Sequence, residues 1–185
     1  MATAGLDRTI KFWDLRKFGS NNAGNGNSPA IAPTKGALLG ESNCKLSVNS
    51  AFFSPSGEYL VATTMSDTLN IYHKAHILAS DTSPKKRKSS KEFIAPDRAI
   101  RHNNQTGRWL TTFMAQWHPE LDIFCIGSMQ KPRAIDVYDG ASGEHMRAIE
   151  GDALTSVASR CCFHLSKDKL VLVGGNSSGR VTVIR

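Results

Sequence analysis

Residues 2–17 read Ala2-Thr3-Ala4-Gly5-Leu6-Asp7-Arg8-Thr9-Ile10-Lys11-Phe12-Trp13-Asp14-Leu15-Arg16-Lys17. A run of small residues leads into a tight turn at Asp7, because a short carboxylate side chain hydrogen-bonds the backbone of such turns. Polar and apolar residues then alternate from Thr9 to Trp13, which is the period of a strand with one buried face. The stretch therefore predicts a turn followed by a β-strand that closes on Trp13-Asp14.

The same layout of strand, turn and strand returns further along the chain, in residues 48–72, 113–138 and 157–184. Pro, Gly and Asp bound these runs, as they do between strands of β-proteins. The last residues of the equivalent strands are 59, 66 and 46 residues apart, at Trp13, Tyr72, Tyr138 and Ile184. A closing Trp-Asp pair in units of about 40–45 residues is the signature of a WD-repeat blade. The predicted fold class for residues 1–185 is all-β, a WD-repeat β-propeller of about three and a half blades.

Two insertions account for the long intervals between repeats. Residues 19–34 are rich in Gly, Asn, Ser and Pro and predict a low-complexity, disordered loop. Residues 82–97 contain a run of cations and predict a basic loop, since loops of this length are usually disordered or functional. Propellers close about 4–8 blades into a ring. We therefore expect a fragment of a ring, with the missing blades upstream.

Composition and motifs exclude several classes of protein. No run approaches the ~18 apolar residues of a membrane helix, and the N-terminus lacks the layout of a signal peptide. The cysteines have no zinc or disulfide spacing and are expected to be core thiols: Cys44, Cys125, Cys161 and Cys162. The six histidines are scattered, and neither a nucleophile elbow nor a phosphate-binding loop occurs. The sequence predicts a non-enzymatic protein with no cofactor, metal site, membrane segment or small-molecule substrate.

The net charge of +7 is concentrated in the second insertion, where five cations supply +5 of it: Lys85, Lys86, Arg87, Lys88 and Lys91. Residues Lys85, Lys86, Arg87 and Lys88, preceded by Pro84, predict a nuclear-import signal. The alternative interpretation is a solvated charge run that only keeps a loop extended.

Replacing these four residues by Ala in a fluorescent fusion should abolish nuclear accumulation, because an import signal of this type depends on its positive charge. Fluorescence microscopy of cells measures the nuclear fraction. Accumulation equal to that of the unchanged protein would favour the solvated charge run.

A second stretch narrows the choice among propellers. It reads Arg-His-Asn-Asn-Gln-Thr-Gly-Arg-Trp-Leu-Thr from Arg101 to Thr111 and runs on to Trp117-His118-Pro119. With residues 129–133, 135–139 and 174–181, it resembles the C-terminal half of one WD-repeat family. That family includes the small subunit of the UV-damaged-DNA-binding complex, the fungal changed-mutation-rate proteins and their animal WD-repeat relative. The resemblance covers nearly the whole chain outside the two insertions.

This resemblance implies a nuclear, seven-bladed DNA-binding propeller with a connection to a cullin–RING ubiquitin ligase. In the UV-damage subunit, the loop before the strand ending in Trp-His-Pro forms a hairpin that enters the minor groove at a lesion. The matching segment here runs from His102 to Trp109. Double-stranded DNA, including damaged DNA, is the expected partner, and the nucleus is the expected location.

The side chains of this segment suit such a role, because minor-groove binders combine Arg, Asn and Gln with a wedge between base steps. Nearby arginines would hold phosphates, and Gly107 allows a turn with positive φ. The predicted DNA-binding residues are Arg98, Arg101, His102, Asn103, Asn104, Gln105, Arg108, Trp109 and Arg133. The alternative is an ordinary solvated turn, with Trp109 in the core at the start of a strand.

The Trp13-Asp14-Leu15-Arg16 segment also resembles the Trp-Asp-x-Arg box of propellers that dock on a ubiquitin-ligase adaptor. The predicted adaptor-binding residues are therefore Trp13, Asp14 and Arg16, with the planar, permanently charged Arg16 as the main contact. The alternative for Arg16 is an intramolecular pair with Asp14 or Asp7, or a solvated position at the rim.

Two functions follow from these observations. The first is a nuclear protein that binds DNA, prefers damaged or distorted sites and acts in the response to DNA damage. The second is a substrate receptor or scaffold for a cullin–RING ubiquitin ligase that does not contact DNA. The segment from His102 to Trp109 would carry the first function, and Arg16 the second.

Overall fold

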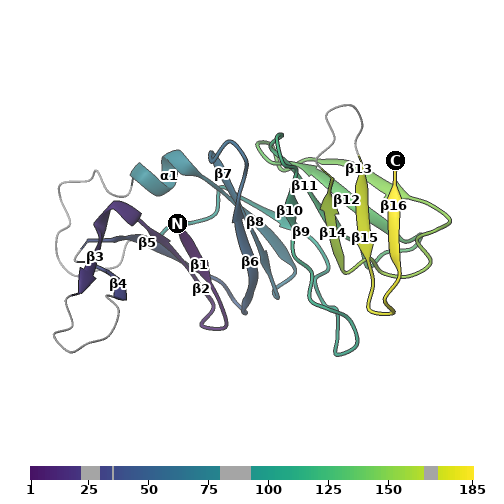
Figure 1. The fold of residues 1–185 in the computed structure, drawn as a ribbon, viewed down its shortest axis with the longest axis horizontal. Coiled ribbons are helices and arrows are strands. Elements are labelled where there is room, and N and C mark those ends of the chain that lie inside the picture. Colours follow the sequence, from purple (N-terminus) through teal and green to yellow (C-terminus); the bar gives the residue numbers. More distant parts are fainter. Residues whose placement is uncertain (22–29, 35, 80–92, 165–170) are drawn as a thin grey trace.

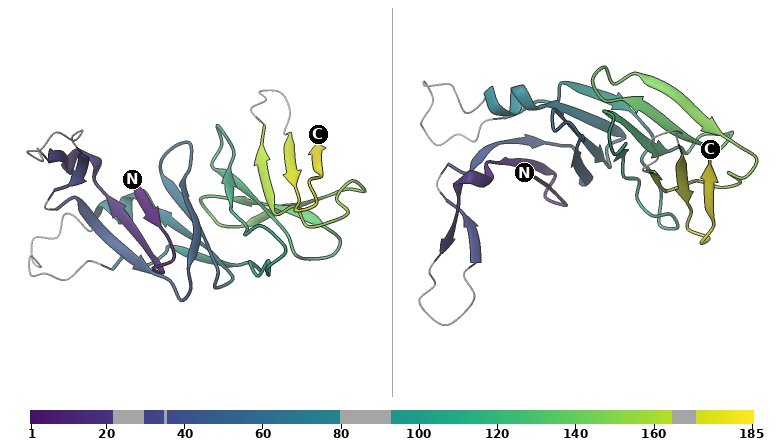
Figure 2. Two further views of the ribbon diagram at one scale, coloured as in Figure 1. Left: turned by 60° about the horizontal axis from the view of Figure 1, so that its bottom comes forward. Right: turned by 45° about the horizontal axis from the view of Figure 1, so that its top comes forward.

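The computed structural model arranges the chain as a row of antiparallel sheets that follow one another along a curve (Figures 1 and 2). It describes residues 1–21, 30–34, 36–79, 93–164 and 171–185. Within each sheet, the strands are ordered as they are in the chain, and among the described strands only one pairing, in the first sheet, passes over two intervening strands. This meander is the arrangement of strands within a propeller blade.

The first sheet contains β1 (Ala2–Ala4), β2 (Thr9–Trp13) and β5 (Leu38–Asn43). The second contains β6 (Val48–Phe53), β7 (Tyr59–Thr64), β8 (Thr68–His73) and β9 (Arg98–Arg101). The third contains β10 (Gln116–Trp117), β11 (Ile123–Gly127), β12 (Ala134–Asp139) and β13 (His145–Glu150). The fourth contains β14 (Arg160–Phe163), β15 (Leu172–Gly175) and β16 (Val181–Ile184). Two four-stranded and two three-stranded sheets confirm the predicted fold class of about three and a half blades.

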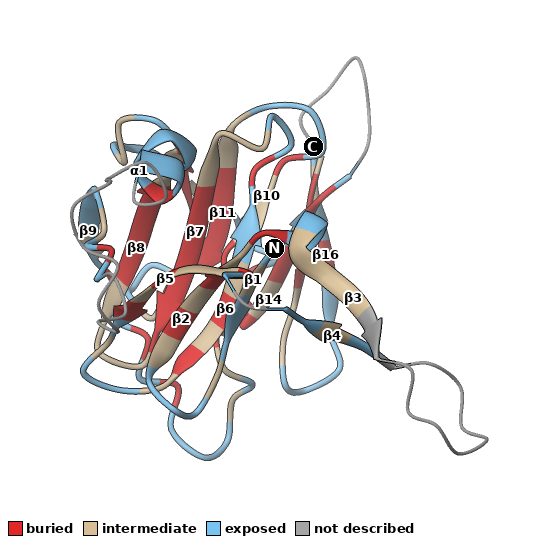
Figure 3. Ribbon diagram, turned by 90° about the vertical axis from the view of Figure 1, so that its left-hand side faces the viewer, coloured by how far each residue is buried: buried red, intermediate tan, exposed pale blue. Residues whose placement is uncertain are grey.

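The first insertion differs from its prediction. After a single 3₁₀ turn, η1 (Leu15–Lys17), strands β3 (Phe18–Asn21) and β4 (Ala30–Pro33) form a two-stranded ribbon that points away from the sheets (Figures 2 and 3). The expectation of a disordered loop over residues 19–34 is therefore wrong for residues 19–21 and 30–33, which form paired strands. Composition favoured a loop, whereas the paired backbone groups of Gly19 and Ala32 extend the ladder between the two strands. Residues 22–29 lie outside the described residues.

The second insertion is attached at both sides to the first two sheets. Helix α1 (Lys74–Ala79) follows β8 and buries Ile77. Residues 80–92, which include Lys85–Lys88, lie outside the described residues, so the import signal remains a prediction. Beyond them, the Ile94 amide donates to the carbonyl oxygen of Glu41 at 2.9 Å, and the Ile94 side chain is buried. Residues 93–94 of the predicted loop are thus held against β5, while the Asp97 amide donates to the Ile71 carbonyl oxygen of β8 at 2.9 Å.

The core lies between successive sheets and is most continuous around β7, β8 and β11 (Figure 3). Apolar side chains of the second sheet, including Val61 and Ile71, share one cluster with Phe113, Phe124 and Ile126 of the third sheet and the segment before it. These inner strands are buried on both faces, which explains their nearly continuous apolar runs. Two of the predicted core thiols, Cys125 and Cys161, are buried, whereas Cys162 is exposed.

Candidate nucleic-acid interface

Alternating strand directions divide the connections between strands into two groups at opposite ends of the sheets. The connections β1–β2, β5–β6, β7–β8, β9–β10, β11–β12, β13–β14 and β15–β16 lie at one end. The turns after β1 and β15 and the long segment after β9 mark this end at the lower edge of Figure 1. We call it the basic end, and the remaining connections form the opposite end.

The connections at the basic end carry an excess of positive charge. The connections at the basic end carry six cations, Arg8, Lys45, Arg108, Lys131, Arg133 and Arg180, against three carboxylates, Asp7, Asp67 and Asp152. The connections at the opposite end carry eleven cations against nine carboxylates in the full sequence, and eight of these cations, among them Lys85–Lys88, lie outside the described residues. Clustered cations attract a polyanion through its phosphates. The basic end therefore has the charge expected of a nucleic-acid surface.

The segment from His102 to Ala115 connects β9 to β10 and carries most of the predicted DNA-binding residues. It contains a turn but no strand, so it is not the β-hairpin that the resemblance implied. Gly107 has φ +64°, as the sequence predicted for this turn. The turn places Gly107, Arg108 and Trp109 at the surface, and we call these three residues the tip.

Two of the predicted contacts are buried beneath the tip. The Asn104 side chain is fully buried, and its Nδ2 donates to the carbonyl oxygen of Thr64 at 2.8 Å. His102 is 8% exposed, packs edge-on against the ring of Phe113, and places Nε2 3.8 Å from a carboxylate oxygen of Asp136. Burial lowers the pKa of His102, which favours the neutral ring. The prediction that Asn104 and His102 contact DNA is therefore wrong, because their polar atoms are used inside the protein.

Gln105 and Asn103 are exposed but partly engaged. Gln105 Nε2 donates to the carbonyl oxygen of Met65 at 2.6 Å and lies 3.2 Å from Asp67 Oδ1. Asn103 is exposed, and its Oδ1 accepts a hydrogen bond from the Gln105 amide at 3.0 Å. The structure therefore retains Asn103 as a candidate contact and gives Gln105 a structural partner.

The tip carries the most exposed aromatic side chain among the described residues. Trp109 is 90% exposed, and the adjacent Arg108 is exposed as well. The alternative that placed Trp109 in the core is wrong: Leu110 and Phe113 turn inward instead and contact the cluster between the second and third sheets. A single exposed apolar residue is common on protein surfaces, but an indole beside a guanidinium offers a flat stacking face together with a positive charge, the combination that binds nucleic-acid bases.

The other three arginines predicted to bind DNA differ in exposure and in the end of the sheets that they face. Arg101 is exposed at the end of β9 and lines a polar cavity of about 410 Å³ with Asn103 and Gln130. Arg133 is half-buried and donates to the carbonyl oxygen of Met129 at 2.7 Å. In the β8–β9 ladder, Arg98 lies opposite Ile71. Its Nε donates to the Ala141 carbonyl oxygen at 3.2 Å. Arg98 therefore points toward the opposite end, and its assignment to the DNA surface is wrong.

Several exposed residues at the basic end were missed by sequence reasoning. They comprise Leu6, which is 89% exposed, and the cations Arg8, Lys45, Lys131 and Arg180. They are spread over four connections, so no local cluster reveals them. The available signal was topological: alternating strands bring every second connection to the same end.

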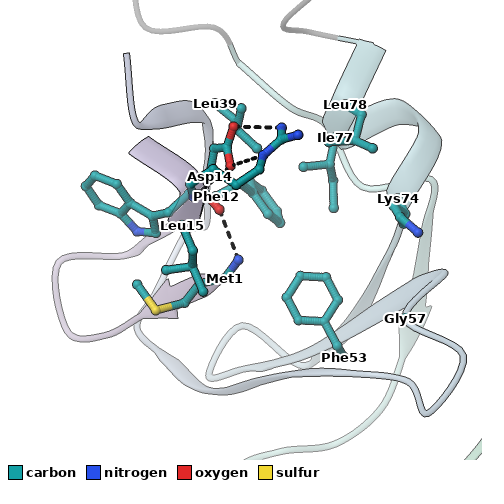
Figure 4. Close-up of a pocket in the computed structure, with 12 residues that line it drawn as sticks. Met1, Phe12, Asp14, Leu15, Leu39, Phe53, Gly57, Lys74, Ile77 and Leu78 are labelled. Carbon is teal, nitrogen blue, oxygen red and sulfur yellow. Dashed lines mark hydrogen bonds and ion pairs between the residues drawn. The ribbon is translucent and has the colours of Figure 1, made fainter. Parts of the chain in front are cut away.

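The predicted adaptor-binding residues lie at the opposite end, around η1. Asp14 is buried, caps η1 and accepts two hydrogen bonds from the Arg16 guanidinium, at 2.9 and 2.8 Å (Figure 4). This contact lowers the pKa of Asp14 to about 2. Trp13 is half-buried, and its Nε1 donates to Thr3 Oγ1 at 2.9 Å. The intramolecular pair considered for Arg16 is therefore present with Asp14, while Asp7 pairs with Lys11 at 2.8 Å.

A mainly apolar cavity adjoins this pair of side chains. Its volume is about 280 Å³, and it is lined by Phe12, Leu39, Phe53, Ile77 and Leu78 together with Asp14 and Arg16 (Figure 4). Arg16 remains 85% exposed beside it even while it holds Asp14. Arg16 thus combines a fixed geometry with access to a partner surface.

Among the described residues, no group of three or more His, Cys, Asp or Glu side chains is arranged to hold a metal ion. In the same parts of the chain, no helix has both the length and the apolar character needed to span a membrane.

Comparisons with known proteins agree with the predicted resemblance. No protein-family model matches the chain. DNA damage-binding protein cmr1 of Aspergillus terreus is 36% identical, over 97% of this chain and 31% of that protein. Proteins of the same name from Chaetomium globosum and Neurospora crassa are each 37% identical, over 98% of this chain and 32% of their own length. The chain spans about a third of the length of these relatives. Over that third, the chain is homologous to the fungal DNA damage-binding proteins cmr1.

Proposed function

We propose that the protein binds double-stranded DNA through its basic end, prefers distorted or damaged sites, and acts in the nucleus in the response to DNA damage. The observation that carries this proposal is the tip, where Trp109 is 90% exposed beside Arg108. The names of the relatives, which describe DNA damage-binding proteins, support it. The proposed role is binding alone, without catalytic chemistry.

The physical argument divides the interaction into two parts. The cations of the basic end would neutralise phosphates, which gives affinity without sequence preference. The Trp109 indole would stack against an opened base step, and stacking of a base on an aromatic ring contributes about 1–3 kcal/mol. Unstacking a base step costs a few kcal/mol in intact DNA and less at a mismatch or lesion. Stacking by Trp109 would therefore give a net gain in binding free energy mainly at sites where the duplex is already weakened.

Replacing Arg108 by Ala should reduce the salt dependence of binding by roughly one unit of slope on a log–log plot, equally for matched and mismatched duplexes. Fluorescence anisotropy titrations at two or more salt concentrations measure the slope. Arg98→Ala is the matched control, because its guanidinium contacts Ala141 away from the basic end. Equal slopes for Arg108→Ala and the unchanged protein, or an equal loss with Arg98→Ala, would place the DNA elsewhere.

A second candidate function is a scaffold or substrate receptor for a cullin–RING ubiquitin ligase. The observation that favours it is the exposed Arg16 guanidinium, fixed by Asp14 next to an apolar cavity (Figure 4). Central arginines beside apolar pockets are common hot spots of protein interfaces. This function uses the opposite end and is compatible with DNA at the basic end.

Arg16→Ala should weaken capture of the ligase adaptor by about 2 kcal/mol or more if Arg16 is such a hot spot, which corresponds to roughly 30-fold in affinity. Titration of purified adaptor measures this change. Lys17→Ala, which removes a neighbouring cation from the same turn, serves as the control, and thermal melting checks folding of both variants. Equal adaptor affinity of folded Arg16→Ala and unchanged protein would show that Arg16 only holds Asp14.

A further inference from the structure

We propose that Asn104 and Asp67 are positioning residues for DNA recognition: without contacting DNA, they fix the tip against the β7–β8 turn before DNA binds. This inference rests on the proposed function of the tip. It assigns a role in the preference for distorted DNA to the buried part of the β9–β10 segment. It assigns the same role to the β7–β8 turn, for which the sequence suggested no function.

The β7–β8 turn is a firm support. It consists of Met65, Ser66 and Asp67, between the paired strand ends Thr64 and Thr68. Thr64 Oγ1 lies 2.9 Å from Ser66 Oγ and 2.8 Å from Thr68 Oγ1, so the hydroxyl groups link both sides of the turn. Asp67 adopts a left-handed backbone with φ +59°. Asp and Asn tolerate this conformation better than most residues.

Hydrogen bonds fasten the start of the β9–β10 segment to this turn. The His102 amide donates to the Asp67 carbonyl oxygen at 3.1 Å, and the Asn104 amide donates to Asp67 Oδ1 at 2.9 Å. Asn104 Nδ2 donates to the carbonyl oxygens of Thr64 and Thr68 at 2.8 and 3.3 Å. The buried side-chain amide of Asn104 thus hydrogen-bonds two carbonyl oxygens at the ends of the turn. The Asp67 carboxylate in turn accepts a hydrogen bond from the backbone of the segment.

The chemistry at position 104 is specific for asparagine. Because Nδ2 faces two carbonyl oxygens, Oδ1 faces His102 Nδ1, 2.7 Å away, and accepts a hydrogen bond from the N–H of that ring nitrogen. Aspartate has almost the same shape but would direct an oxygen at those carbonyl groups. The substitution therefore removes both donated hydrogen bonds and sets acceptor against acceptor, with almost no change in the volume of the side chain.

The far side of the tip is fastened as well. Thr111 Oγ1 lies 2.9 Å from Ser159 Oγ in the connection before the fourth sheet, and Phe113 is fully buried. Between the two anchors, the tip residues Gly107–Trp109 are exposed. A short exposed turn held at both sides has little conformational freedom to lose on binding, and this lowers the cost of association. The anchors thereby make insertion of Trp109 more favourable.

Asn104→Asp should reduce the preference for a mismatched over a matched duplex roughly ten-fold, because the tip loses its fixed position when buried polar groups are left unpaired. The slope of affinity against salt should stay unchanged, since Asn104 contacts no phosphate. Asn103→Asp is the charge-matched control: it adds the same charge one residue away and keeps the Oδ1 contact to Gln105. This control should weaken binding to both duplexes equally.

A second pair of variants separates positioning from folding. Asp67→Asn and Asp67→Gly both remove the negative charge and both accept φ +59°, but only Asn keeps an oxygen for the Asn104 amide. We expect Asp67→Asn to retain the preference for the mismatch and Asp67→Gly to lose it. Equal preference in these two variants, with both folded by thermal melting, would overturn the positioning role.

The outcome in a Trp109→Ala background distinguishes this proposal from the proposed function. If Asn104 acts through the tip, Asn104→Asp should not lower the preference further once Trp109 is absent. An unchanged preference with Trp109→Ala alone would contradict the proposed function itself. A loss with Trp109→Ala, together with no effect of Asn104→Asp or the same effect in both backgrounds, would contradict only the positioning role.

Discussion

Trp109→Ala is expected to abolish the preference of the protein for distorted DNA while leaving most of its affinity for a matched duplex. The loss of one stacked base–indole contact corresponds to about 5- to 150-fold in affinity for the mismatched duplex. The matched duplex should be affected little, because its binding depends on phosphate contacts made by cations such as Arg8 and Arg108. Competition titrations with the two duplexes in one buffer measure the ratio directly.

A change in the stability of the fold should not affect the affinity ratio of the Trp109→Ala variant. Trp109 is 90% exposed and contributes little to the core, so the melting temperature of the variant should be unchanged. Trp109→Phe should retain part of the preference, because a smaller ring still stacks. Leu121→Ala is a control at the opposite end, where Leu121 is also an exposed apolar residue. A preference that survives in Trp109→Ala would make the tip an ordinary solvated turn and favour the scaffold function.

The sheets were predictable because their signals are local. Alternation and turn residues within 5–10 positions mark the strands around Asp7, Pro55 and Gly57, and the resulting sheets have the expected order. The positive φ of Gly107 followed from the same kind of local rule. Composition alone was less reliable, since the Gly- and Asn-rich first insertion begins and ends in paired strands.

The candidate site was less predictable because its partners are distant in sequence. Asn104 has a polar side chain in a polar segment, yet it is fully buried. Its hydrogen-bond partners there are carbonyl oxygens of residues 36 and 40 positions away in the sequence. Nothing local distinguishes it from the exposed Asn103. Trp109 shows the reverse, since an aromatic residue before a strand usually packs inward, whereas here Leu110 contacts the core instead.

The charge of the basic end was also hidden in the linear sequence. Its six cations come from five separate connections, and only Lys131 and Arg133 share one. The sequence instead draws attention to Lys85–Lys88, which supply charge in a single run. A surface assembled from alternate turns becomes visible only once the direction of each strand is known.

Gly127→Ala should produce the largest loss of stability, because no space exists for a methyl group at the end of β11. A Cβ there would overlap the Ala158 carbonyl oxygen, and it would lie 2.9 Å from the carbonyl carbon of Ala158 and 3.0 Å from the ring of Phe113. Backbone atoms cannot move aside as a flexible side chain does, so the third sheet and the segment before β14 must separate. Overpacking of cores typically costs about 1–3 kcal/mol, and this contact lies at or above the upper value.

For a chain of this size, about 3 kcal/mol corresponds to a decrease in melting temperature of roughly 6–12 °C. Gly151→Ala is the matched control, since nothing lies within 4 Å of its added Cβ, and its melting temperature should stay within about 2 °C of the unchanged protein. Circular dichroism melts of the three proteins give the comparison. If Gly127→Ala melted together with Gly151→Ala, the close approach of β11 to Ala158 would not hold the third and fourth sheets together. The buried side of the tip would then lack the rigid support on which its selectivity depends, because Phe113 packs against the same glycine.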